Sequence, residues 1–166
     1  MLSPFLKKLL FARQFTIEDG KIEIIKLRNM LISPDFILNL QEKDPDALYK
    51  LSKNIMKKDL DFFNKTISLK SQASIDRIKD IYEIFGFGKI QILDFDTKNK
   101  RGVVNILDSP IAKAHLLNNK VSSEPKCHFI AGKISGIFSF LFKKDVNAKE
   151  VKCMAKGDDF CQFVIK

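Results

Sequence analysis

The chain has 166 residues, of which 45% are hydrophobic and 30% charged, a length and balance typical of one globular domain. Its net charge of +9 arises from 29 basic and 20 acidic residues, and the basic residues are almost all lysines spread along the chain. No basic helix, zinc-finger framework or aromatic RNA-binding motif accompanies the charge. The composition therefore argues against specific nucleic-acid binding and favours a solvated, lysine-rich surface.

The chain also lacks the signals of a secreted or membrane-spanning protein. The N-terminal apolar stretch is interrupted by Lys7, Lys8 and Arg13 and has no small-residue cleavage site. The apolar run 134–142 is too short to cross a bilayer, which needs about 20 residues. We therefore expect no membrane span and a cytoplasmic location, where cysteines are metal ligands or buried apolar groups more often than disulfides.

The first predicted elements are two strands, 15–18 and 21–25, which follow an apolar lead-in. Asp19-Gly20 between them is a strong hairpin signal. Residues 1–33 are thus expected to form a lead-in and a hairpin, which is a possible dimerisation element.

Helical periodicity begins after this hairpin. Ser33 can cap a helix with Pro34 in its first turn. Apolar residues then recur at intervals of three and four up to about Ile84, and the segment 43–46 interrupts them, so two or three helices are expected. Gly86 follows the last of them and suits a left-handed C-cap.

Beyond Gly86 the apolar period changes from about 3.6 to 2, which indicates strands. The expected elements are strands 89–95 and 102–108, a short helix at 111–117 capped by Ser109-Pro110, a helix at 127–142, and strands 151–155 and 160–165. This order of strands, helices, strands, helix and strands predicts an α+β fold with a mainly antiparallel sheet.

Three cysteines lie in the C-terminal third of the chain. A hairpin centred on Gly157 places Cys153 opposite Cys161, with Cβ atoms about 5 Å apart. Two thiolates at this separation can share one tetrahedral metal with bonds of about 2.3 Å. Cys127 begins the preceding helix, whose dipole favours a thiolate. The pattern suggests zinc, although cysteines in such domains are also often small buried apolar residues.

The fourth metal ligand is ambiguous on spacing alone. Glu150 can supply an oxygen, but it falls on the opposite face of an ideal strand from Cys153 unless a turn or a bulge intervenes. His128 is the substitute, but its neighbour Cys127 points about 100° away around a helix. Both residues stay candidates at this point.

Several segments resemble a known family when they are taken together. They are Glu150-Val-Lys-Cys153-Met-Ala-Lys-Gly157-Asp-Asp-Phe-Cys161-Gln-Phe163-Val-Ile165, Pro125-Lys-Cys127-His-Phe-Ile-Ala-Gly132-Lys-Ile-Ser-Gly136, Phe85-Gly86-Phe87-Gly88, Asp108-Ser109-Pro110-Ile111-Ala112 and Arg28-Asn-Met-Leu-Ile-Ser-Pro34. They resemble the 4-vinyl reductase domain family, most strongly over residues 81–166. The resemblance implies a single domain of this type over residues 1–166.

The resemblance also implies a metal site and a pocket. The spacing of the cysteines and the glutamate is similar to the zinc site of phenol-type sensor domains, which implies the ligands Cys127, Glu150, Cys153 and Cys161. Such a closed set has no position for water, so the zinc is expected to be structural. The family fold, also similar to vesicle-tethering subunits that hold a fatty acyl chain, implies an apolar pocket between helices and sheet, and a homodimer by analogy.

Helix and strand spacing suggests which residues line this pocket, although all of them can equally be plain core. They are Val104, Ile106, Ala131, Ile134 and Phe138. Since none is a polar handle, an aliphatic or lipid-like ligand is expected rather than a phenol.

The sequence favours a non-catalytic sensor or carrier of an apolar, hydrocarbon- or lipid-like small molecule. Only His115 and His128 are available for acid–base chemistry by histidine, and no Gly-rich dinucleotide loop opens a helix. The alternatives are an accessory subunit in tetrapyrrole vinyl reduction, with hydride supplied by a partner, and a ligand-free interaction scaffold.

Overall fold

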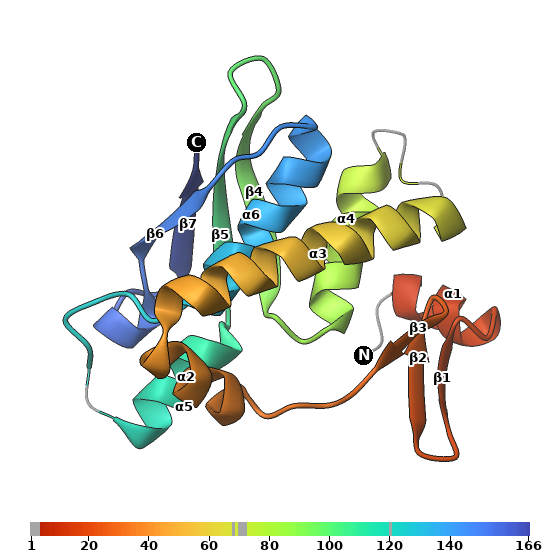
Figure 1. Ribbon diagram of the computed structural model, residues 1–166, viewed down its shortest axis with the longest axis horizontal. Helices are drawn as coiled ribbons and strands as arrows, with labels where there is room; N and C mark the ends of the chain where they lie inside the picture. The colour runs from red at the N-terminus through yellow and green to blue at the C-terminus, as the bar shows by residue number, and fades with distance from the viewer. Residues whose placement is uncertain (1–3, 68, 70–72, 120) are drawn as a thin grey trace.

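The computed structural model describes residues 4–67, 69, 73–119 and 121–166. Its elements (Figure 1) are α1 (Pro4–Phe11), β1 (Phe15–Glu18), β2 (Lys21–Ile24), β3 (Leu27–Asn29), α2 (Pro34–Lys43), α3 (Pro45–Ile67), α4 (Ala73–Ile84), β4 (Lys89–Asp96), β5 (Arg101–Leu107), α5 (Pro110–Asn118), α6 (His128–Phe142), β6 (Ala148–Lys152), the 3₁₀ turn η1 (Met154–Lys156) and β7 (Cys161–Ile165). The predicted α+β class is confirmed.

The main sheet has the strand order β4-β5-β7-β6, and its neighbouring strands are antiparallel. α6 packs against this sheet, and the long helix α3 crosses α6 on its other side (Figure 1). α6 is therefore the middle layer, which explains why its sequence is apolar on nearly every side instead of along one stripe. In the described ranges, no helix is both long and apolar enough to cross a bilayer.

Two glycines of α6 set its distance from α3. A Cβ on Gly132 would overlap the Ser52 hydroxyl and the carbonyl oxygen of Tyr49. A Cβ on Gly136, one turn later, would lie 2.6 Å from the carbonyl oxygen of Lys53. Because only hydrogen fits at both positions, the two helices pack backbone against backbone.

The N-terminal residues form a smaller unit of α1 with the sheet β1-β2-β3. The predicted hairpin is confirmed, with Asp19 and Gly20 at φ of 49° and 71°. The lead-in is a helix, α1, and Leu27–Asn29 adds a third strand that the sequence analysis did not predict. A three-residue strand is too short to establish an alternating pattern of apolar residues.

The serine caps are confirmed at the starts of two helices. The Ser33 hydroxyl accepts the Phe36 N–H at 3.3 Å, and the Ser109 hydroxyl accepts the Ala112 N–H at 3.4 Å. The first strand of the C-terminal hairpin, however, begins and ends earlier than the predicted 151–155. The chain leaves it after Lys152 because η1 forms before Gly157, whose φ is 93°.

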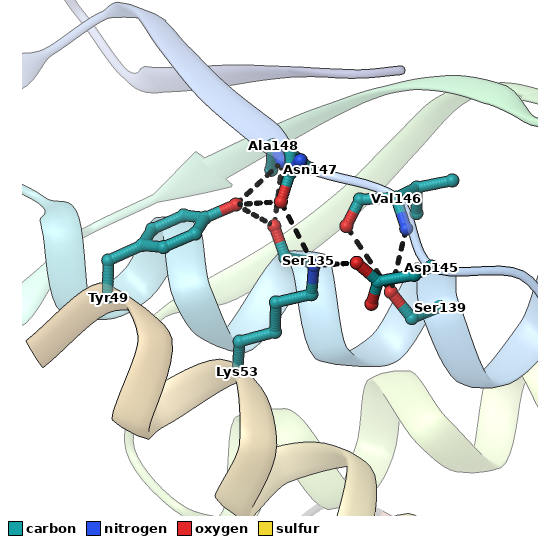
Figure 2. Close-up of polar contacts among 8 residues, drawn as sticks. All are labelled: Tyr49, Lys53, Ser135, Ser139, Asp145, Val146, Asn147 and Ala148. Atoms are coloured by element: carbon teal, nitrogen blue, oxygen red, sulfur yellow. Dashed lines mark hydrogen bonds and ion pairs between the residues drawn. The ribbon is translucent and has the colours of Figure 1, made fainter. Parts of the chain in front are cut away.

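A polar network fastens the start of β6 to α3 and α6 (Figure 2). The Tyr49 hydroxyl of α3 hydrogen-bonds the Ser135 hydroxyl of α6. Both oxygens accept the N–H of Ala148, at 3.1 and 2.7 Å respectively. The remaining members of the network, joined by side-chain hydrogen bonds and one ion pair, are Lys53, Ser139, Asp145, Val146 and Asn147. The network thereby positions the strand that carries Glu150.

We expect the two hydroxyls to act as substitutes for each other. Tyr49→Phe and Ser135→Ala should each lower the free energy of unfolding by about 1 kcal/mol, because the Ala148 N–H keeps one acceptor. The double variant should lose more than the sum, since this N–H then has neither hydroxyl as acceptor. Urea denaturation of the four proteins measures the difference, and strictly additive losses would contradict the shared bond.

Candidate metal centre and apolar cavity

Cys127, Glu150, Cys153 and Cys161 converge at one end of the main sheet; we call them the Cys₃Glu cluster. Cys127 is the N-cap residue of α6, and Cys161 is the first residue of β7. Cys153 directly follows β6 and precedes η1. The loop before α6 and the C-terminal hairpin thus supply all four side chains.

The three sulfurs of the cluster lie at the spacing of a tetrahedral metal site. Cys127 Sγ is 3.9 Å from Cys153 Sγ and 3.6 Å from Cys161 Sγ, and the last pair is 4.0 Å apart. Metal–sulfur bonds of about 2.3 Å in a tetrahedron place sulfurs about 3.8 Å apart. One ligand atom from each of the four residues lies within 4.8 Å of the others. The cluster can therefore hold a metal ion.

A β-bulge brings Glu150 into the cluster. The register of β6 on β7 shifts between Glu150 and Lys152, which removes the objection that Glu150 and Cys153 fall on opposite faces of a regular strand. Glu150 Oε2 accepts the Cys127 N–H at 2.9 Å, and in the part of the chain that the structure describes Oε1 has no hydrogen-bond partner. A buried carboxylate oxygen without a partner fits a metal ligand. His128 is not part of the cluster.

The electrostatics of the cluster favour a bound cation. Burial, followed by the charge of Cys153, raises the pKa of Glu150 to about 8. Hydrogen bonds from the thiols of Cys127 and Cys161 lower the pKa of Cys153, and donating such bonds, together with burial, raises the pKa of Cys127. One thiolate is thus favoured over several, and a divalent metal would supply the charge that ionises the other donors.

The five residues predicted to line a pocket are all in the apolar core. Val104, Ile106, Ile134 and Phe138 are fully buried, and Ala131 is 5% exposed. They belong to β5 and to the side of α6 that lies against the main sheet. Their role in ligand binding stays a prediction.

A cavity of about 280 Å³ lies on the other side of α6. It lies between α3, α6, the segment after α4 and the linker from β3 to α2, and its walls are mainly apolar. Its lining residues are Asn29, Met30, Leu31, Ile32, Ile37, Ile55, Met56, Asp59, Phe63, Phe85, Phe87, Phe129 and Lys133. Since Met30 and Leu31 are exposed, the cavity opens to solvent along the linker.

Two charged residues interrupt this apolar wall. Lys133 is only 6% exposed, and its Nζ lies 5.3 Å from the ring centroid of Phe87 and 5.4 Å from that of Phe129. Burial lowers the pKa of Lys133, and the nearby charge of Asp59 opposes that shift. Burial also raises the pKa of Asp59, which is half-buried.

The sequence analysis missed Lys133, although the sequence contains a signal for it. Lys133 is the only charged residue between His128 and Phe142, a segment otherwise apolar or small. A lone lysine inside a buried helix needs a partner or a special environment. The face it occupies could not be assigned without knowing where α3 crosses α6.

Comparison with known proteins identifies the C-terminal part of the chain. Residues 107–166 match the profile of the 4-vinyl reductase domain. An uncharacterized protein of Methanocaldococcus jannaschii is 33% identical over 89 residues, which are 54% of this chain and 50% of that protein. The phenol regulator MopR of Acinetobacter guillouiae is 31% identical over 74 residues, 45% of this chain and 13% of MopR. The chain thus spans about half or less of the length of these two relatives.

The fold is also similar to a solved sensor structure. The phenol-responsive sensory domain of the transcription activator PoxR, determined with phenol, superposes with a TM-score of 0.78 over 99% of this chain and 91% of that domain, at 18% identity. At this identity the likeness concerns the fold. The matched residues 107–166 contain the whole Cys₃Glu cluster. Residues 107–166 therefore belong to the 4-vinyl reductase domain family, as the sequence resemblance predicted.

Proposed function

We propose that the chain is a non-catalytic, zinc-containing domain that binds an apolar small molecule as a sensor or carrier. The observation that carries this proposal is that α6 joins the two sites. Cys127 caps the helix, and Phe129 and Lys133 in its first two turns line the cavity. The similarity to a phenol regulator and to a phenol-responsive sensory domain supports a sensor role.

The metal in this proposal is structural. Three thiolates and one carboxylate fill the four positions that zinc prefers and leave none for an activated water. The residues of this chain would then fix the start of α6 to the C-terminal hairpin. Elemental analysis of purified protein should find about one zinc per chain.

The apolar cavity is tested with a pair of matched tryptophan substitutions on α3. Ile55 lines the cavity, whereas Leu51, one turn earlier and also partly exposed, is not among its lining residues. Ile55→Trp should fill the cavity and weaken the binding of 1-octanol or phenol about tenfold or more, because the ligand loses its contact surface. Leu51→Trp should leave binding unchanged.

Isothermal titration calorimetry of the wild-type protein and both variants measures these affinities. If neither 1-octanol nor phenol binds the wild-type chain, the proposal of an apolar ligand fails. If both variants bind as tightly as the wild type, the ligand lies elsewhere, and the core positions predicted from sequence become the next to test.

The homodimer predicted from the sequence is part of the same proposal. Exposed apolar side chains on the N-terminal unit support it, since Phe11 is 95% and Ile17 65% exposed. Sedimentation equilibrium should give twice the chain mass, and Phe11→Lys together with Ile17→Lys should restore the monomer.

A further inference from the structure

Lys133 is a buried cation without an anionic contact. It makes no ion pair and no hydrogen bond with a described residue, and only the faces of Phe87 and Phe129 contact its ammonium group. Cation–π contacts replace part of the lost hydration but supply no acceptor for the three N–H donors. Buried ammonium groups are ordinarily paired, so this one calls for a partner.

Asp59 does not supply that partner. It lies on α3, lines the same cavity and is close enough to act on Lys133 through its charge, yet the two side chains form no ion pair. Asp59 is also the more exposed of the two residues. The cavity therefore has a cation set into its apolar wall and a carboxylate nearer to solvent.

We propose that the cavity binds a small amphipathic monocarboxylate, with its carboxylate on Lys133 Nζ and its apolar chain against Ile55, Met56 and Phe63. This inference rests on the proposed function and names the class of its ligand. A carboxylate accepts charge-assisted hydrogen bonds from the ammonium group and neutralises it. A neutral alcohol accepts one bond and leaves the charge.

The size and walls of the cavity fit such a ligand. About 280 Å³ is at the low end for ligand pockets, which span roughly 300–1,000 Å³. The stacked rings of Phe85 and Phe87, with centroids 5.9 Å apart, and the edge-on ring of Phe129 form a flat apolar wall beside Lys133. A short aliphatic or arylalkyl chain can lie along this wall while its head group reaches the lysine.

The test compares octanoate with 1-octanol, two probes that share a tail and differ in the head group. The wild-type chain should bind octanoate about tenfold or more tightly than 1-octanol, the range expected of a charge-assisted bond. Lys133→Met should abolish this preference and retain 1-octanol binding. Lys133→Arg should keep the preference, since it keeps a cation at the same place.

Two further variants separate a contact from a general charge effect. Asp59→Asn should tighten octanoate binding several-fold, because it removes a like charge from the cavity, and it should leave 1-octanol unchanged. Lys57→Met removes an exposed lysine from the same helix as Asp59 and should change neither affinity. Circular dichroism establishes that each variant is folded.

The outcomes distinguish this inference from the proposed function. If 1-octanol binds as tightly as octanoate, or if folded Lys133→Met and the wild type show the same octanoate-to-octanol ratio, the carboxylate proposal is overturned while apolar binding stands. If neither probe binds any of the proteins, both proposals are overturned.

Discussion

Zinc is expected to raise the melting temperature of the chain by roughly 8–16 °C when its free concentration is about a thousandfold above its Kd. Binding to the folded state alone stabilises by about 4 kcal/mol at that ratio. A domain of this size gains roughly 2–4 °C per kcal/mol. Cys161→Ser should abolish most of this gain, because a hydroxyl is a poor substitute for a thiolate on zinc. Scanning calorimetry with zinc and with a chelator measures the difference.

The two candidates for the fourth ligand provide the matched controls. Glu150→Gln should lose part of the zinc-dependent shift, because Glu150 belongs to the Cys₃Glu cluster. His128→Ala should keep the whole shift, although His128 is next to Cys127 in sequence. A wild-type chain whose melting temperature does not respond to zinc would contradict the structural site, and loss of the response in His128→Ala would reassign the fourth ligand.

Gly132→Ala is expected to lower the free energy of unfolding by about 2 kcal/mol or more. The new methyl group would overlap the Ser52 hydroxyl and the carbonyl oxygen of Tyr49, and backbone cannot rotate away as a side chain can. Overpacking costs about 1–3 kcal/mol, sometimes more, and the better helix propensity of alanine offsets about 1 kcal/mol of it. The variant should therefore be clearly less stable in urea denaturation.

A second substitution identifies which atom causes the loss. Ser52→Ala removes the hydroxyl but leaves the carbonyl of Tyr49, so the double variant with Gly132→Ala should recover only part of the stability. Full recovery would show that the helices are not in backbone contact. Because α3 and α6 also form opposite walls of the cavity, Gly132→Ala should weaken 1-octanol binding as well.

The parts of the fold that could be predicted from sequence are those with a local cause. Asp19-Gly20 favours positive φ at a hairpin turn, and Ser33 and Ser109 each supply an N-cap oxygen before a proline. These preferences act over three or four residues. The third strand Leu27–Asn29 has no such local cause, since only its pairing with β2 makes it a strand.

The candidate site divides in the same way. The alignment that brings Cys153 near Cys161 follows from the turn at Gly157, and Lys152 pairs with Gln162 as that alignment requires. The bulge after Glu150 has no local sequence signal, so Glu150 and His128 could be separated only through family resemblance. Lys133 needed the tertiary structure, because the crossing of α3 over α6 determines which wall it lines.

The bulge between Glu150 and Lys152 makes the metal's donor set depend on how many residues the strand contains. Side chains alternate along a regular strand, so removing Val151 and with it the bulge would turn the Glu150 carboxylate to the opposite face. Three sulfurs would then remain, with an open fourth position of the kind found in catalytic zinc sites. A one-residue deletion, with every ligand still present in the sequence, would thus separate a closed metal site from a reactive one.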